Sequence, residues 1–420
     1  MTRLPRVLRG VAEGSSGHLA AHLQLRGPLP ELRRWAPARL IDEVERSGLR
    51  GRGGAAFPVA KKMRAVSARG GPKIVVGNGT EGEPASGKDR LLLTATPHLV
   101  LDGAAVAARA VGAGSAIIAF PEGDDEIVES VEAAVSERRQ ARLDGEPRFE
   151  LLAVEEGFVT GNESAVVNAL SGGEAKPTFG PRPFERGVRR CPTLVQNVET
   201  LAHLGLIVRH GAKWFRQAGT VRDPGSTLVT LSGAVASPGV YEIEHGAPLS
   251  DLLESAGLTE DLTAVLVGGY FGSWLSSEVI PRLLLSPGEL SEHGASLGAG
   301  VIIALGRSAC PVVETARIAD YFASQTAGQC GPCVNGLAAI ADTMQQVASG
   351  TATATAGPDL TRWSSSLAGR GACQFPDGAT RFVATALQVF AEAFEDHMRH
   401  GPCDRCSNLP VLPAPIAFAY

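Results

Sequence analysis

The sequence predicts an α/β protein in which a largely parallel sheet, covered by helices, is followed by a small α+β module and a helical C-terminal third. Short apolar runs alternate with longer amphipathic stretches up to residue 222, a pattern typical of parallel sheets with helices on their faces. Two strand-like runs and a short helix come next, and from Pro311 onward almost every signal is helical.

The first part of the chain supplies the parallel sheet. Residues 1–34 lack sustained periodicity and are predicted to form a loosely held arm, and residues 35–222 form the α/β domain. Within this domain a helix runs from Ala38 to Leu49 and ends at the glycine-rich segment Gly51–Pro58. Strands are predicted at 74–76, 116–120 and 149–154, and helices at 99–111 and 126–138.

Three further segments complete the predicted organisation. Residues 223–308 form the α+β module, with strands at 227–235, 238–243 and 301–305 and a helix that ends at Gly257. Residues 309–402 form a helical bundle, because apolar side chains recur at helical spacing at 337–347 and again at 383–394. Residues 403–420 form a tail that carries a Cys-x-x-Cys pair.

The bulk composition excludes some classes of protein. The chain has 420 residues, of which 44% are hydrophobic and 20% charged, so it is long enough for more than one packed domain. A net charge of −5 and an aromatic content of 5% argue against nucleic-acid binding, which needs a concentrated basic face. No apolar run reaches membrane-spanning length and the N-terminus lacks the apolar core of a signal peptide, so we expect a cytoplasmic protein.

Cysteines in the last third of the chain indicate electron transfer. Cys330 and Cys333 share a short loop and Cys373 follows in a distant segment, which is how proteins supply thiolates to an iron–sulfur cluster. We therefore predict that these three cysteines are metal ligands. Seven cysteines are an odd number in a chain that is too large to need disulfides, so metal or redox chemistry explains them better.

The glycine-rich segment Gly51–Pro58 can bring backbone amides close to a phosphate, and Lys62 follows it as a nearby cation. A tight turn without any ligand explains the same composition equally well.

Three polar clusters lie where ligands of open α/β sheets bind, beyond the carboxyl ends of strands or at helix N-termini. They are Asn78–Glu83, Gly161–Glu163 and Gln196–Thr200. Solvated turns and helix caps are the alternative for each cluster.

In this order the segments resemble the flavin-bearing, NADH-oxidising subunit of respiratory complex I (the family of NADH-quinone oxidoreductase F subunits) and its relatives in NAD-linked hydrogenases and formate dehydrogenases. The resemblance spans about residues 35–400 and is carried by Ser47–Pro58, Asn78–Pro84 with Lys88–Arg90, Asn197–Thr200, Ser232–Tyr241 and Gly328–Cys333. It implies a Rossmann-like domain that binds FMN and the nucleotide at 35–222 and a ubiquitin-like β-grasp (SLBB) domain at 223–308. It also implies that the bundle at 309–402 holds a [4Fe-4S] cluster.

The same resemblance implies the site residues. FMN and NAD(H) would be held by Gly51, Gly53, Gly54, Phe57, Lys62, Asn78, Glu81, Glu83, Gly161, Asn162, Glu163, Gln196, Asn197 and Thr200. Phe57, Lys62 and Glu83 would meet NADH, and Lys62 and Glu83 are the two residues expected to act in catalysis. The flavin would take the hydride and release electrons singly to iron–sulfur, so the protein supplies orientation and electrostatics.

Several positions depart from the family pattern. Ala327 replaces the first cluster cysteine, Thr80 an aspartate, Asn162 the first of two glutamates, Phe158 a tyrosine and Gln196 an asparagine. Ala65 stands where an aromatic side chain would pack on the adenine, and one lost stack costs on the order of 1 kcal/mol. We therefore expect weakened NADH binding.

Several arrangements of the cysteines are open. Three thiolates can hold a [3Fe-4S] cluster or a [4Fe-4S] cluster with one open site, or Cys403 and Cys406 can fold back and supply a fourth thiolate. Alternatively the two Cys-x-x-Cys pairs make a zinc site. Cys191 and Cys310 are expected to be plain core or surface residues, and the histidines, His397 among them, surface or capping residues.

We expect an NADH dehydrogenase-type oxidoreductase subunit that passes electrons between NADH, FMN and an iron–sulfur cluster to a small [2Fe-2S] or ferredoxin-type carrier subunit. It would lie in the cytoplasm or reach the inner face of a membrane-bound complex through a partner. Two alternatives are a ferredoxin-linked flavoprotein without NADH activity and a scaffold that keeps the fold without catalysis. The sequence support for these alternatives is the same list of substitutions, Ala65, Thr80, Phe158, Asn162, Gln196 and Ala327.

Overall fold

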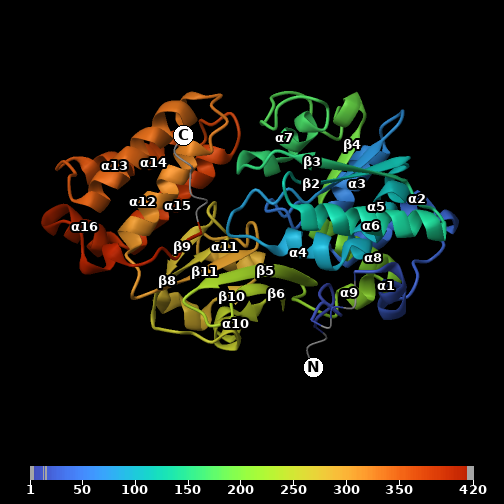
Figure 1. The fold of residues 1–420 in the computed structure, drawn as a ribbon, viewed down its shortest axis with the longest axis horizontal. Coiled ribbons are helices and arrows are strands. Elements are labelled where there is room, and N and C mark those ends of the chain that lie inside the picture. The colour runs from blue at the N-terminus through green and yellow to red at the C-terminus, as the bar shows by residue number, and fades with distance from the viewer. Residues whose placement is uncertain (1–3, 13, 15–16, 414–420) are drawn as a thin grey trace. The chain divides into compact units, whose positions relative to one another are not determined.

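The computed structural model describes residues 4–12, 14 and 17–413. The chain divides into two compact units (Figure 1), one of residues 1–82, 87–229 and 240–246 and the other of residues 83–86, 230–239 and 247–420. Parts of the predicted arm (1–3, 13 and 15–16) and of the predicted tail (414–420) lie outside the described residues.

The first unit is built on a parallel sheet of four strands in the order β3-β2-β1-β4. Val75 of β1 pairs with Ala116 of β2 on one side and with Leu194 of β4 on the other. The strands are β1 (Ile74–Asn78), β2 (Ser115–Pro121), β3 (Arg148–Val154) and β4 (Thr193–Asn197). The helices are α1 (Leu19–Arg26), α2 (Pro37–Ser47), α3 (Val59–Ser67), α4 (Lys88–Ala95), α5 (Pro97–Val111), α6 (Asp125–Ala141), α7 (Glu163–Ala169), α8 (Val198–His210) and α9 (Ala212–Phe215).

Successive strand residues face opposite sides of this sheet, so each strand contributes to two cores. Val75 and Ile118 belong to a large core with α2 to α6 and α8, whereas Val76 and Ile117 belong to a smaller core with α7. Both faces of the sheet pack against apolar cores, which explains why β1 and β2 are continuous apolar runs in the sequence. The predicted α/β class with a parallel sheet is confirmed.

Proline and glycine mark the ends of two helices in this unit. α2 and α5 each begin with proline at the first turn and end at glycines in left-handed conformation, Gly48 (φ 76°) and Gly112 (φ 75°). The predicted end of the first helix at Leu49 is therefore slightly late. The short strand β4 was not predicted, because its sequence ends in the polar pair Gln196–Asn197.

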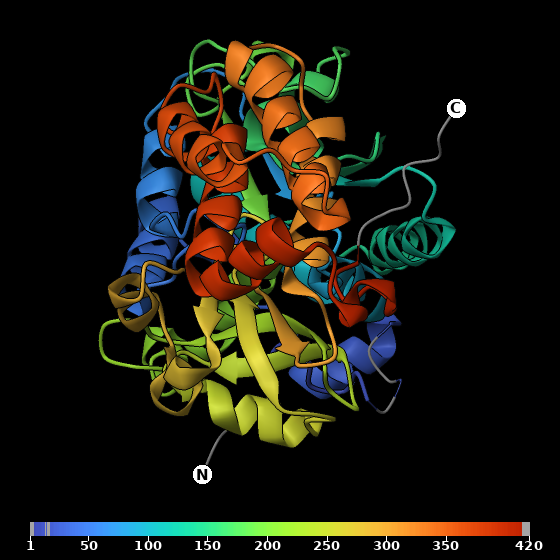
Figure 2. The same ribbon diagram turned by 90° about the vertical axis from the view of Figure 1, so that its left-hand side faces the viewer.

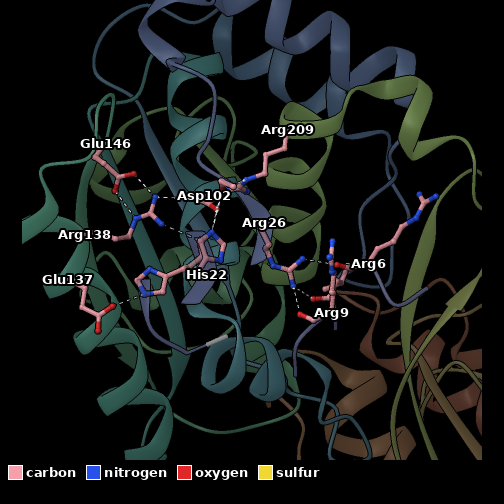
Figure 3. A network of polar contacts seen from close by, with 12 residues as sticks. Arg6, Arg9, His22, Arg26, Asp102, Glu137, Arg138, Glu146 and Arg209 are labelled. Carbon is pink, nitrogen blue, oxygen red and sulfur yellow. Dashed lines mark hydrogen bonds and ion pairs between the residues drawn. The ribbon is translucent and has the colours of Figure 1, made fainter. Parts of the chain in front are cut away.

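The prediction of a loosely held arm is wrong for the described residues of that segment. Arg26 of α1 is buried, and its guanidinium donates hydrogen bonds to the backbone oxygens of Arg6, Val7 and Arg9 at 2.7 to 3.0 Å (Figure 3). Arg6 in turn donates to the backbone oxygen of Phe215 at 3.0 Å. Apolar periodicity could not reveal this anchoring, since charged side chains provide it.

A buried carboxylate continues this network. Asp102 of α5 lies between His22, Arg138 and Arg209, at 2.7 Å from the His22 Nε2 and 2.9 Å from an Arg138 nitrogen (Figure 3). Burial alone would raise the pKa of the Asp102 carboxyl. The hydrogen bond from His22 and the charges of Arg138 and Arg209 outweigh burial, so this pKa lies well below its usual range. α1 is thus fastened to α5 by the hydrogen bond between His22 and Asp102, a carboxylate that arginines of α6 and α8 also contact.

The second sheet has five strands in the order β6-β5-β11-β8-β9. β11 runs parallel to β5 and antiparallel to β8, the mixed pairing of a β-grasp. Its strands are β5 (Ser226–Gly233), β6 (Gly239–Glu244), β8 (Leu262–Val267), β9 (Ser273–Ser276) and β11 (Val301–Gly306). A pair of two-residue strands, β7 (Ala247–Pro248) and β10 (Leu284–Leu285), and the helices α10 (Leu249–Ala256) and α11 (Pro287–Glu292) complete it.

The C-terminal helices, orange to red in Figure 2, form the predicted bundle. They are α12 (Pro311–Ser324), α13 (Ala338–Ser349), α14 (Ala356–Leu367), α15 (Phe375–Val389) and α16 (Ala391–His400). Aromatic rings join this bundle to the turn and strand after β8, where Phe271 lies 5.3 Å from Phe375 and Trp274 lies 5.1 Å from Phe390 between ring centroids. Within the described residues no single helix is long and apolar enough to cross a membrane, and α4 with α5 meets that test only jointly, with a bend of 96°.

Candidate functional site

The glycine-rich segment forms a closed loop. The Gly51 N–H donates to the Phe57 oxygen at 2.9 Å, and the chain between them includes positive φ angles at Gly54 (100°) and Ala56 (46°). In the described part of the chain, the N–H groups of Gly53, Gly54 and Ala55 have no protein acceptor. Such free amides can bind phosphate oxygens.

This loop rests on the start of α8. The Arg52 N–H donates to the Thr200 Oγ1 at 2.9 Å, and the buried Arg52 guanidinium donates to the Ser226 oxygen at 3.0 Å. A Cβ at Gly53 would lie 3.2 Å from the Cβ of Asn197, so the backbone approaches β4 more closely than most side chains allow. The predicted residues Gly51, Gly53, Gly54 and Thr200 therefore come together.

Two asparagines join the ends of neighbouring strands. Asn197 ends β4 beside Asn78 at the end of β1, and its Nδ2 donates to the Asn78 oxygen at 3.3 Å. Its Oδ1 accepts from the Glu199 N–H at 2.9 Å and caps α8. Asn78 donates to the Gly161 oxygen at 3.0 Å and accepts from Thr80. Both amides are used within the protein, so they position the site's backbone.

Beneath the loop lies a buried charge cluster that the sequence did not reveal as a unit. The Lys88 Nζ lies 2.7 Å from Asp89 Oδ1 and 3.1 Å from Glu199 Oε2, and all three residues are at most 4% exposed. Burial raises the pKa of the Asp89 carboxyl to about 7, against the pull of Lys88. For Glu199 burial is outweighed by Lys88, His203 and Arg52, and its pKa lies far below its usual range. The family resemblance implies flavin contacts for Asn197 and Thr200, but it gave no role to Lys88, Asp89 or Glu199.

The lysine behind the loop has two protein partners. The Lys62 Nζ donates to Glu163 Oε2 at 2.7 Å and to the Val195 oxygen at 2.8 Å. Asn162 caps α7 by accepting from the Ser164 N–H at 2.9 Å. The Nε2 of Gln196 is buried and has no hydrogen-bond partner among the described residues, which is a costly state unless a ligand supplies an acceptor.

The two remaining glutamates hold backbone groups. Glu81 (φ 40°) accepts from the N–H groups of Asp89 and Arg90 at 2.9 and 2.8 Å, and so stabilises the start of α4. Glu83 is buried and accepts from the Tyr270 N–H at 2.8 Å in the second unit. Phe57, in contrast, is 51% exposed.

These positions fit a flavin nucleotide. Free loop amides, an orphaned Gln196 amide and a cation at Lys62 lie at the carboxyl edge of the parallel sheet, where α/β proteins bind nucleotides. The roles of the individual residues stay predictions.

The three predicted cluster cysteines lie near one another. Cys333 is the second residue of a π-helical turn, Pro332–Leu337, and its N–H donates to the Cys330 oxygen at 3.1 Å. Burial and the neighbouring Cys330 raise the pKa of Cys333 to about 12, and burial with Cys330 also raises that of Cys373. Burial disfavours the Cys330 thiolate too, but hydrogen bonds from Ala372 and Cys333 bring its pKa below the usual value. A cationic metal core would offset this mutual repulsion of thiolates.

Cys403 and Cys406 do not join this group. Their sulfur atoms lie with Cys310 Sγ and a ring nitrogen of His397, all four ligand atoms being within 4.8 Å of one another. Cys310 directly precedes α12, whose 14 residues span about 21 Å, and Cys330 follows the other end of this helix. The hypotheses of a fourth thiolate from this pair and of a zinc site between the two Cys-x-x-Cys pairs are therefore wrong. His397 is buried, so the prediction that it is a surface or capping residue is wrong, whereas Cys310 is buried, as predicted for a core residue.

Three protein-family models match the chain. They are described as the Nuo51 FMN-binding domain (residues 44–205), the SLBB domain (residues 228–267) and the NADH-ubiquinone oxidoreductase-F iron-sulfur binding region (residues 314–397). The last of these contains Cys330, Cys333 and Cys373 but not Cys310, Cys403 or Cys406.

Similar whole proteins were also found. The chain is 32% identical to the F 2 subunit of the NADH-quinone oxidoreductase of Rhizobium meliloti, over 95% of this chain and 99% of that protein. It is 31% identical to the corresponding F subunit of Streptomyces coelicolor, over 88% of this chain and 85% of the other. A chain of the NAD+-reducing [NiFe]-hydrogenase in its H2-reduced state superposes with a TM-score of 0.84 at 30% identity, covering 94% of this chain and 67% of that one. This chain therefore belongs to the family of NADH-quinone oxidoreductase F subunits.

Proposed function

We propose that this chain is the electron-input subunit of a multi-subunit oxidoreductase, in which it passes electrons from NADH through FMN to an iron–sulfur cluster. The observation that carries the proposal is the loop at Gly51–Phe57, whose free amides lie at the carboxyl edge of the parallel sheet in the region that matches an FMN-binding domain. The cysteine loop at 330–333 lies in the region that matches the family's iron–sulfur model.

Bound FMN supplies the conversion of hydride chemistry into single-electron transfer. The protein's own residues have two tasks. The amides of Gly53 and Gly54 hold the flavin phosphate, with the Lys62 ammonium nearby, and Gln196 Nε2 donates to a flavin acceptor. Asn78, Glu81, Asn197 and Thr200 hold the backbone that presents these groups.

For NADH we propose Phe57, Lys62 and Glu83 as contacts. The exposure of Phe57 supports this, because an apolar ring left in water gains by covering a nicotinamide or adenine. Glu83 keeps a fixed orientation through the Tyr270 N–H.

The cluster takes three protein thiolates, from Cys330, Cys333 and Cys373. Ala327 stands where the fourth would be, and it is 8% exposed. We further propose the domain bounds 35–222, 223–308 and 309–402, since each contains one of the matched regions. The electron acceptor would be a small [2Fe-2S] or ferredoxin-type subunit, and contact with a membrane, at the inner face, would come through such partners.

Rapid mixing of the purified, flavin-loaded chain with NADH tests the function. We expect the absorbance band of the oxidised flavin to disappear after mixing. The spectrum of a reduced iron–sulfur cluster should then follow. Flavin that stays oxidised with NADH but is reduced by a reduced ferredoxin would instead identify the ferredoxin-linked alternative. A chain that binds neither FMN nor iron under anaerobic reconstitution would identify the scaffold.

A further inference from the structure

Four residues outside the proposed electron path form a second compact ligand group. We propose that Cys310, His397, Cys403 and Cys406 bind one zinc ion in a closed tetrahedral site that clasps the segment after α16 to the start of α12. Only His397 falls inside the region that matches the family's iron–sulfur model, as its last residue.

The distances are those of ligands around a single ion. Cys406 Sγ lies 3.6 Å from both Cys403 Sγ and Cys310 Sγ, and the His397 Nε2 lies 3.5 Å from Cys310 Sγ and 3.8 Å from Cys406 Sγ. A regular tetrahedron with zinc–sulfur bonds of 2.3 Å has sulfur–sulfur edges of about 3.8 Å, and a sulfur–nitrogen edge of about 3.5 Å. The remaining two pairs lie within 4.8 Å.

These distances also exclude an iron–sulfur cluster at this place. An iron–sulfur cluster has at least two irons, and ligands of different irons must stand apart by the width of the inorganic core, which four atoms mutually within 4.8 Å cannot surround. Three thiolates and one imidazole, with no place left for a water, are a common structural zinc set.

Local structure prepares the four ligands. Cys403 precedes a 3-10 turn, Asp404–Ser407, that contains Cys406, and the Cys406 N–H donates to the Cys403 oxygen at 3.0 Å. Cys310 caps α12 and His397 lies in the last turn of α16, and both are buried. Cys-x-x-Cys turns of this kind present two sulfurs to one ion.

The site lies within a line of contacts between two segments of the second unit. On one side Asn408 donates to the Ser308 oxygen at 2.7 Å, and on the other the buried Glu314 accepts from the Val411 N–H at 2.7 Å and the Leu412 N–H at 3.2 Å. A zinc ion bound between these two sets of contacts would hold residues 403–413 along α12. Because α12 leads into the cysteine loop at 330–333, this clasp would fix the end of the helix that is distant from the cluster.

Metal analysis of the full-length chain tests the proposal. Wild-type protein, purified anaerobically without chelator, should contain about one zinc per chain. Cys406→Ser and His397→Ala should each lose it, whereas Cys191→Ser, a cysteine outside both groups, should keep it. Cys373→Ala should lose cluster iron and keep zinc, so failure of the proposed cluster is distinguishable from failure of this site.

Zinc-edge X-ray absorption of the wild-type chain does not depend on how the variants fold. It should show about three sulfurs at 2.3 Å and one nitrogen near 2.0 Å. Absence of zinc, zinc retained in both Cys406→Ser and His397→Ala, a mononuclear iron in its place or a Cys403–Cys406 disulfide in the native protein would each overturn the proposal.

Discussion

The backbone N–H of Arg52 donates to the Thr200 side chain at 2.9 Å, and this bond ties the glycine-rich loop to the start of α8. The two residues are 148 positions apart in the chain, so the loop conformation depends on the sheet and helix beneath it. Loss of the bond would leave a buried N–H without an acceptor and free the loop whose amides are proposed to bind flavin.

We predict that Thr200→Val raises the FMN dissociation constant about tenfold, because a buried unsatisfied donor costs about 1–3 kcal/mol. Thr200→Ser keeps the Oγ and should bind FMN as the wild type does. Quenching of flavin fluorescence on titration with apoprotein measures both. Equal affinity in all three proteins would show that the loop does not need this bond to hold the flavin.

The buried pair of Lys88 and Glu199 supports the same region by charge. Removing one partner of such a pair leaves an uncompensated buried charge and costs about 3–5 kcal/mol. We predict that Lys88→Met lowers the thermal midpoint by several degrees, whereas Arg399→Ala, which breaks an exposed pair with Glu395, changes it little. Calorimetry at one scan rate compares them, and similar shifts in the two variants would contradict the assigned role.

Acid should weaken the fold through buried histidines. Burial, followed by the charges of Arg138 and His22, lowers the pKa of His98 to about 4. The unfolded chain takes up a proton near pH 6.5 while the folded chain does not, so stability falls as the pH drops from about 6.5 to about 4, by about 2 kcal/mol at pH 5 for this group.

Glutamine in the variant His98→Gln takes up no proton in this pH range, and its side-chain amide can still donate a hydrogen bond to Glu137. The thermal midpoint of this variant should therefore depend less on pH between 7 and 5 than that of the wild type. His293→Gln changes an exposed histidine and should leave the pH dependence as it is. A profile for His98→Gln that superposes on the wild type would show that His98 titrates normally.

The sequence predicted the α/β class because each strand of the sheet carries apolar residues for both faces, as Val75 and Val76 do. It missed the anchoring of the N-terminal segment, where Arg26 and His22 make the contacts and no apolar period exists. Charge networks of this kind depend on residues far apart in the chain, and local patterns do not report them.

The candidate site was likewise only partly predictable from local sequence patterns. The order of motifs was enough to predict that the glycine loop and three cysteines, Cys330, Cys333 and Cys373, belong to binding sites. The grouping of Cys403 and Cys406 with Cys310 was not predictable, because 93 residues separate Cys310 from Cys403 and only the packing of α12 against α16 brings them together. A Cys-x-x-Cys pair is a signal for half of a metal site, and the other half has no fixed spacing.

We expect Lys62 to contribute more to the reaction with NADH than the neighbouring Lys61 does. Its Nζ contacts Glu163 and the Val195 oxygen beside the proposed flavin site, whereas Lys61 is exposed. We predict that Lys62→Met lowers kcat/KM for NADH at least about tenfold, by the loss of one charge-assisted contact, and that Lys61→Met does not. Steady-state rates with an artificial acceptor, normalised to bound FMN, measure this. Equal kcat/KM values would remove Lys62 from the nucleotide site.

The fourth cluster position offers the last prediction. Ala327 lies three residues before Cys330, and Gly328 after it has a left-handed φ of 66°, so the backbone turns there as it leaves α12. We predict that Ala327→Cys supplies a fourth thiolate and slows the loss of iron to a chelator, because every iron of a [4Fe-4S] core then has a protein ligand. Ser324→Cys adds an exposed thiol nearby and should not slow it. Iron content with electron paramagnetic resonance of both variants measures the change. Iron loss as fast in Ala327→Cys as in the wild type would show that residue 327 does not face the cluster.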